Sequence, residues 1–228
     1  MKNIYFVRTL CFLFLVTLSC QSTKVVNAWK AEESIVNAFK EKNVLVIART
    51  ANDQGRIAFE VEIANALRAK GIKATESYTK APKIYPNKEI TEERVAFIRS
   101  LMESEGYNGV MLTVIKDKQQ TVTKSHNGIY MGASYNNFYP GYYGNFYNYF
   151  SYPYAYGSYY NSFGGYVTSS TSTSVSTDYV LETVAYNLDE PADKQLVGVV
   201  TTKLYDPKDA HKVASKIVPK VVEELNKK

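Results

Sequence analysis

The sequence predicts an α/β fold with a mixed sheet of four to five strands and with helices packed mainly on one face. Two compact aliphatic runs, at 43–48 and 109–115, have the composition of strands that are buried on both faces. A helix-periodic segment follows the first run, and another precedes the second. Two further apolar runs, at 177–188 and 196–206, flank the turn sequence DEPADKQ and predict a hairpin.

The first two helices are recognisable from their ends. The segment RIAFEVEIANALRAKG presents one apolar face and stops at Gly71, a residue that commonly terminates helices. Residues 72–78 follow as a candidate edge strand. Thr91 is a suitable N-cap for the second helix, with acidic residues in its first turn, and Gly106 ends it.

The last helix begins near Pro207 or Lys208 and has apolar residues at helical spacing up to the end of the chain. Pro219 lies inside this pattern, so we expect it to kink or restart the helix. The predicted element order is therefore β-α-β-α-β-β-β-α.

The first 19 residues have the pattern of a secretory signal peptide, with a short basic start and an apolar run too short to span a bilayer. The ending TLSC resembles the lipobox of bacterial lipoproteins, in which the cysteine is acylated and becomes the first mature residue. The resemblance implies lipidation of Cys20. The alternative is an ordinary signal peptide with an incidental cysteine.

Residues 20–42 are predicted to form a lipidated tether and lead-in, and 43–228 a single α/β domain. Residues 21–27 are read as a polar tether, and AWKAEESIVNAFKEK as a short helix or an irregular lead-in. After cleavage only Cys20 remains of the two cysteines, so the stability of the domain must come from its core rather than from a disulfide.

Charge and composition exclude some classes of function. Lysine and arginine number 27 against 22 aspartate and glutamate residues, and loss of Lys2 and Arg8 with the signal peptide leaves a net charge of +3. Such a weak balance gives no reason to expect nucleic-acid binding, which needs clustered basic residues.

A wider resemblance rests on AWK, FKEKNVLVIA, R-x-x-FE at 56–60, ALRAKGIKA, YVLETVAYNL and a final Val-rich helix. Together these resemble a family of poorly characterised bacterial envelope lipoproteins, whose domain is similar to the N-terminal domain of TolB and to curli-secretion lipoproteins of the CsgG class. The resemblance implies location and architecture more than a reaction. Within it, Phe59 is expected in the core, and Arg56 and Glu60 to pair on the helix surface.

A low-complexity insert is expected at about 127–176. Thirteen of the 20 tyrosines lie between Tyr130 and Tyr166, interleaved with Gly, Asn, Ser and Pro, which disrupt helical and strand periodicity. A long hairpin insert of this kind is usually functional or disordered. Tyrosine favours recognition of sugars, protein grooves or lipid headgroups; the alternative is a self-associating loop without a dedicated ligand. The candidate contact residues are Tyr142, Tyr143, Tyr147, Tyr149, Tyr154, Tyr156, Tyr159 and Tyr160.

No catalytic, cofactor or metal site is predicted. His126 lies in the turn-forming sequence TKSHNG and His211 near the start of the last helix, and both are expected to be solvated. Metal-ligand spacing, a nucleophile elbow and a phosphate-binding loop are all missing from the sequence. The carboxylate pairs Glu60 with Glu62 and Glu92 with Glu93 have the spacing of solvated helix faces.

The sequence thus predicts a non-enzymatic lipoprotein of the cell envelope, anchored by Cys20 in a membrane that faces the periplasm, in particular the outer membrane. Its Tyr-rich loop would contact an envelope protein or a glycan. The second hypothesis is a structural subunit of a self-assembling envelope or secretion complex, which would make the protein a homo-oligomer. An enzyme acting on peptidoglycan or lipid is a third.

Overall fold

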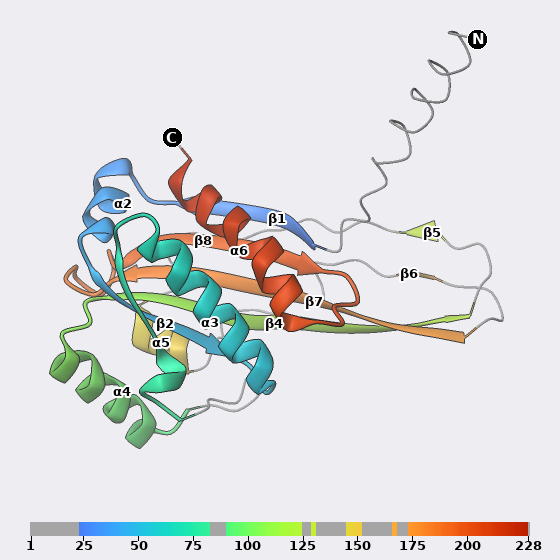
Figure 1. Cartoon of the computed structure of the whole chain (residues 1–228), viewed down its shortest axis with the longest axis horizontal. Coiled ribbons are helices and arrows are strands. Elements are labelled where there is room, and N and C mark those ends of the chain that lie inside the picture. Colours follow the sequence, from blue (N-terminus) through green and yellow to red (C-terminus); the bar gives the residue numbers. More distant parts are fainter. Residues whose placement is uncertain are drawn as a thin grey trace, which may run out of the picture.

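The computed structural model describes residues 23–82, 90–124, 129–130, 145–151, 166–167 and 173–227. Within them the chain forms strands and helices around one central sheet (Figure 1). The elements are β1 (Thr23–Lys30), α2 (Glu33–Lys40), β2 (Asn43–Arg49), α3 (Asp53–Arg68), β3 (Lys73–Glu76), a 3₁₀ turn (Ser77–Thr79), α4 (Glu92–Glu105), β4 (Gly109–Lys124), β5 (Ile129–Tyr130), α5 (Phe146–Ser151), β6 (Tyr166–Val167), β7 (Thr173–Asn187), β8 (Leu196–Leu204) and α6 (Ala210–Asn226).

The main sheet has six strands in the order β1-β8-β7-β4-β2-β3. Strand β2 runs parallel to β3 and β4, and the other pairings are antiparallel, so the sheet is mixed as predicted. The prediction of four to five strands is wrong, because β1 adds a sixth strand that was not predicted. Residues 21–27 were predicted to be a polar tether, but from Thr23 onward they begin the edge strand β1. This strand pairs with β8, from Thr23 opposite Leu204 to Lys30 opposite Gly198.

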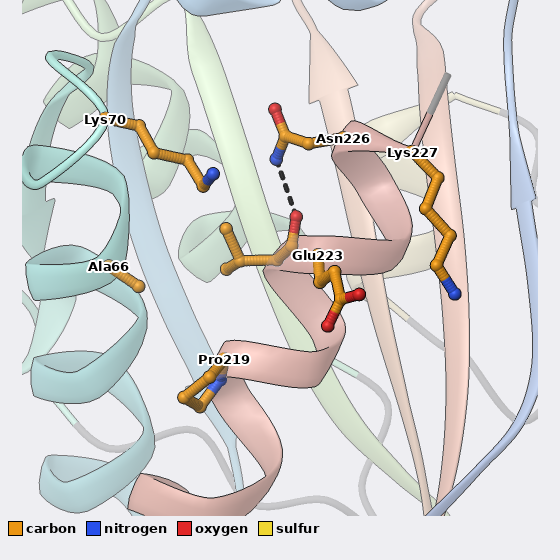
Figure 2. Close-up of a pocket in the computed structure, with 7 residues that line it drawn as sticks. Ala66, Lys70, Pro219, Glu223, Asn226 and Lys227 are labelled. Atoms are coloured by element: carbon orange, nitrogen blue, oxygen red, sulfur yellow. Dashed lines mark hydrogen bonds between the residues drawn. The ribbon is translucent and has the colours of Figure 1, made fainter.

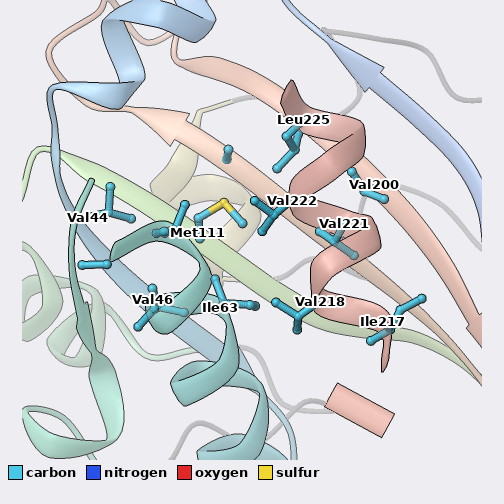
Figure 3. Packing of buried hydrophobic residues seen from close by; sticks show 14 of the residues in the cluster. Val44, Val46, Ile63, Met111, Val200, Ile217, Val218, Val221, Val222 and Leu225 are labelled. Carbon is cyan, nitrogen blue, oxygen red and sulfur yellow. The ribbon is translucent and has the colours of Figure 1, made fainter. Parts of the chain in front are cut away.

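Helices cover both faces of the sheet, which corrects the prediction that they lie mainly on one. Helices α2, α3 and α6 pack on one face, where Val44, Val46 and Met111 of the sheet meet Ile63 of α3 and the valines of α6 (Figure 3). Helices α4 and α5 contribute to a second apolar cluster on the opposite face. Alternation along β2 explains the two layers, because successive side chains of a strand point to opposite faces.

Most helix ends agree with their predicted signals. Thr91 Oγ1 accepts a hydrogen bond from Arg94 N at 3.4 Å, and Gly106 ends α4 in the left-handed conformation at φ 68°. The last helix starts slightly later than predicted, at Ala210, because Asp209 caps it. It then continues through Pro219 as one helix.

Strands β4 and β7 extend well beyond their neighbours as a two-stranded ribbon. Their pairing continues past Lys118 opposite Tyr179 to Lys124 opposite Thr173, whereas β8 ends at Leu204, which pairs with Tyr179. The ribbon leaves one end of the sheet in Figure 1. The Tyr-rich insert therefore begins and ends at the tip of this ribbon, and β5 and β6 pair with each other within it.

Candidate functional site

Helix α5 lies in the middle of the Tyr-rich insert, yet it packs against the central sheet. Phe146, Tyr149 and Phe150 are fully buried, and the Phe146 ring lies 5.8 Å from that of Tyr186 on β7. Full burial of one such ring contributes about 1.5–3 kcal/mol. Three buried aromatic side chains therefore fasten a six-residue helix to the domain, and we call this contact the α5 dock.

Polar groups of the domain hold both ends of α5. At its start, Gln195 Oε1 accepts a hydrogen bond from Phe146 N at 3.3 Å. At its end, Arg49 Nη1 donates to the carbonyl oxygens of Phe150 at 2.8 Å and Ser151 at 3.2 Å. A guanidinium at a helix C-terminus satisfies carbonyls that lack a partner within the helix. Arg49 is itself 1% exposed, so its guanidinium caps α5 from within the interior of the domain.

A buried ion pair lies beneath the dock. Lys116 Nζ is 3.7 Å from Glu182 Oε2, and both side chains are fully buried. Tyr149 Oη donates to the same carboxylate oxygen at 2.5 Å, and Lys116 Nζ lies 5.3 Å from the centre of the Tyr149 ring. Tyr149 thus joins the insert to the only charged residue of β7 in this apolar stretch, YVLETVAY.

The backbone places Lys116 in this network through a β-bulge. The register between β4 and β7 shifts between Ile115 and Asp117, so Lys116 is the additional residue at that point. Burial lowers the pKa of Lys116, and the carboxylate of Glu182 opposes this shift. A charged lysine is kept in the core because its partner lies on the adjacent strand.

A second buried ion pair lies on the other side of the sheet, between α3 and the turn after β3. Glu60 Oε1 accepts from Arg56 Nε at 3.0 Å and from Ser77 Oγ at 2.8 Å, and Oε2 accepts from Tyr78 N at 2.6 Å. Arg56 also donates to the carbonyl oxygen of Ala81. Burial raises the pKa of Glu60, opposed by these donors. The expected surface pairing is therefore wrong: the pair is buried and fastens the β3–α4 connection to α3.

A groove of about 450 Å³ lies between α3 and α6 (Figure 2). Ala66, Pro219 and Val222 form its apolar part, and Lys70 and Glu223 are among the charged residues that line it. Within the described part of the chain, no group of three or more His, Cys, Asp or Glu residues could hold a metal ion. In the same part, none of the helices has the length and apolar character needed to cross a bilayer.

No protein-family model and no curated protein matches the sequence. Among solved structures, this chain is similar to PelC from Paraburkholderia phytofirmans, which was solved as a dodecamer. The TM-score is 0.39, with 12% identity over 90% of this chain and 97% of that chain. A single-residue variant of the PelC dodecamer gives a TM-score of 0.39 with 10% identity, covering 91% and 99% of the two chains. These values describe a distant structural resemblance.

The structure describes two of the eight tyrosines proposed as contact residues. Tyr149 is fully buried, so its ring belongs to the core and is not presented to a partner. Tyr147 is half-buried, its ring lies 4.8 Å from the Arg99 guanidinium of α4, and burial raises its pKa. Tyr142, Tyr143, Tyr154, Tyr156, Tyr159 and Tyr160 lie outside the described residues, as do Cys20 and His126.

The remaining candidates are not brought together. His211 is exposed near the start of α6, and Glu92 and Glu93 are exposed in the first turn of α4. Sequence reasoning missed the residues that build the dock, Arg49, Lys116 and Glu182. Their signal was present, because each is a charged residue within or at the end of an otherwise apolar strand.

Proposed function

We propose that this protein is a non-enzymatic lipoprotein of the cell envelope, anchored through Cys20 in the outer membrane and facing the periplasm. Its domain, for which the sequence suggests a likeness to the TolB N-terminal domain and CsgG-class lipoproteins, acts as an interaction or scaffold module. The Tyr-rich insert contacts an envelope protein or glycan. One observation carries the proposal: the α5 dock fastens the middle of the insert to the sheet.

The dock divides one long insert into two shorter segments. The chain from the end of β4 at Lys124 to the start of β7 at Thr173 is held at both ends by the ribbon and near its centre by α5. The insert is therefore attached to the domain at the ribbon and at α5. Shorter closed segments have fewer conformations to lose on binding, which improves the affinity that a given contact area provides.

The buried carboxylates fit a structural role better than a catalytic one. Both oxygens of Glu60 accept hydrogen bonds from the β3–α4 connection, Oε1 from Ser77 Oγ and Oε2 from Tyr78 N. Glu182 Oε2 accepts from Tyr149 and pairs with Lys116. Groups that already hold the fold together in this way would lose those contacts if they exchanged protons with a substrate, which supports the non-enzymatic part of the proposal.

The second candidate is a structural subunit of a self-assembling envelope or secretion complex. The ribbon of β4 and β7 favours it. A two-stranded ribbon is only marginally stable in water by itself, and addition of a strand from another copy would stabilise its edges. In this case the Tyr-rich insert would lie at a contact between copies.

The test is a crosslinking pull-down from intact envelopes with a variant that keeps the dock. Tyr142, Tyr143, Tyr154, Tyr156, Tyr159 and Tyr160 are replaced by serine, while Phe146–Ser151 is left unchanged. The matched control is Tyr78→Ser, which removes an exposed tyrosine outside the insert.

If the insert is the recognition surface, the native protein and the control capture the same protein or glycan, and the six-tyrosine variant loses it while circular dichroism stays native. Equal capture by all three refutes recognition by these tyrosines. Light scattering of the detergent-solubilised native protein separates the two candidates, because a self-assembling subunit would be a defined oligomer of this chain alone.

A further inference from the structure

The chain enters the domain at the end of the sheet from which the ribbon projects. Thr23, the first residue of β1, pairs with Leu204, Leu204 pairs with Tyr179, and Tyr179 pairs with Lys118. These four residues form one row across the sheet. Neighbouring strands lie about 4.8 Å apart, and β4 is the third strand from β1. Thr23 is therefore only about 14 Å from β4, the more distant of the two ribbon strands.

The proposed lipid anchor is very close to this row. Cys20 precedes Thr23 by three residues, which span at most about 11 Å when fully extended. If Cys20 is lipidated, as proposed above, its acyl chains hold this end of the sheet next to the membrane. The opposite end of the sheet, where β8 begins, lies about 30 Å farther from Cys20, which is the length of the nine-residue strand β8.

Side chains at this end have the chemistry of a membrane interface. Lys118 Nζ lies 6.0 Å from the centre of the Tyr179 ring, and Lys203 Nζ lies 5.0 Å from that of Tyr205, which is 40% exposed. Lys24 is exposed and is paired in register with Lys203. Tyrosine and lysine are enriched where proteins meet lipid headgroups, because the ring lies at headgroup level and the ammonium reaches water or phosphate. We call these five residues the anchor corner.

The charge balance of the corner favours an anionic surface. Asp178 pairs with Lys203 at 3.2 Å, and Asp206 pairs with Lys208 in the adjacent loop at 2.8 Å. Lys24 and Lys118 are the two exposed lysines of the corner that are not in these two pairs. Each lysine near an anionic leaflet strengthens binding about fivefold at low salt.

We propose that the anchor corner docks on the headgroups of the leaflet that holds Cys20, which gives the domain a fixed orientation on the membrane. This inference rests on the lipidation in the proposed function. The six pairs from Gln119 to Lys124 extend the ribbon about 20 Å beyond this corner, so the strands must be inclined to the membrane, with the polar ribbon running along the headgroups and not into the bilayer. The Tyr-rich insert accordingly meets its partner close to the bilayer.

The first test measures which end of the domain touches lipid. The lipidated mature protein carries Trp29→Phe, which removes its single tryptophan, and then either Tyr205→Trp in the corner or Ala192→Trp in the exposed turn before β8. Both are reconstituted in vesicles of phosphatidylethanolamine and phosphatidylglycerol with brominated acyl chains. Docking predicts several-fold stronger quenching by bromine at position 205 than at 192.

The second test measures the contribution of charge without the anchor. The mature chain with Cys20→Ser is mixed with the same vesicles, unbrominated, and its bound fraction is measured by sedimentation. Lys24→Gln and Lys118→Gln should each weaken binding about fivefold at low salt. The matched control is Lys40→Gln, an exposed lysine of α2 at the opposite end of the sheet, which should leave binding unchanged.

Equal quenching at positions 205 and 192 would overturn the proposal, since the corner would then have no preferred contact with lipid. Protection of position 205 from both bromine and aqueous acrylamide would also overturn it, because a protein, such as another copy, would cover the corner. Failure of the proposed function is seen separately: an intact-mass measurement of the native protein without acyl chains refutes lipidation at Cys20, whatever the quenching shows.

Discussion

Substitution of Lys116 by methionine removes the cation from the buried pair beneath the α5 dock while keeping a long unbranched side chain. Glu182 is then left as a fully buried carboxylate without the ammonium that lies 3.7 Å from it in the native protein. Removal of one partner from a buried ion pair typically costs about 3–5 kcal/mol, because the remaining charge has lost both water and its counter-charge. We expect Lys116→Met to lower the free energy of unfolding by that amount.

The assay is urea-induced unfolding of the mature chain, followed by circular dichroism at neutral pH. The matched control is Lys42→Met, which removes an ion pair of 2.6 Å to a half-exposed partner, Asp189. Pairs that are accessible to water contribute about 0–1 kcal/mol, so the control should change stability little. A loss below about 1 kcal/mol for Lys116→Met would refute a charged pair in the core.

The double variant Lys116→Met with Glu182→Leu sharpens the same argument. Replacement of both charges by apolar side chains removes the desolvation cost together with the attraction, so much of the stability lost in the single variant should return. Tyr149 loses its acceptor in this variant, so the return should be incomplete. A double variant as unstable as the single one would show that packing, not charge, causes the loss.

Three further substitutions test other contacts by the same urea assay. Tyr149→Phe removes the hydroxyl that donates to Glu182 and should cost about 1–3 kcal/mol, with weaker capture of the partner because α5 docks less firmly; unchanged stability and capture would contradict the dock. Gly198→Ala would place a Cβ 2.5 Å from Leu225 Cδ2 and should cost about 1–3 kcal/mol, and an unchanged free energy of unfolding would contradict this close packing. Glu60→Gln should cost about 3–5 kcal/mol because a buried guanidinium loses its counter-charge, and a neutral result would mean that this pair is not buried in solution.

Much of the layered architecture was predictable from local patterns. The aliphatic runs that become β2 and β4 are buried on both faces, and the signals at Thr91 and Gly106 mark the observed ends of α4. Strand β1 was missed because TKVVNAWK has neither an aliphatic run nor regular alternation. It is a strand because β8 offers it an edge, and pairing between distant segments has no local signal.

The site was harder to predict than the fold. The segment around α5 reads as low complexity, and six residues are too few to show helical periodicity. Phe146, Tyr149 and Phe150 are buried because an apolar face of the sheet lies beneath them, which only the assembled fold provides. The charges of Lys116 and Glu182 were visible in apolar strands, but that they meet depends on strand order and on a bulge.

The pH dependence of stability gives an independent test of the buried lysine. Burial holds the pKa of Lys116 in the folded protein below the ordinary value of 10.5 that it regains on unfolding. Between these two values the unfolded chain binds more protons than the folded one, so this lysine makes stability rise with pH. The destabilising contribution is fully present below the folded pKa and is relieved as the pH approaches 10.5.

Unfolding free energies of the native protein and of Lys116→Met, measured between about pH 7 and about pH 10, should therefore diverge, with the native protein gaining stability relative to the variant as the pH rises. Ionisable groups far from Lys116 are the same in both proteins, so their contributions cancel in the difference. Parallel curves would mean that Lys116 titrates as it does in water, and the buried ion pair that supports the dock would have to be abandoned.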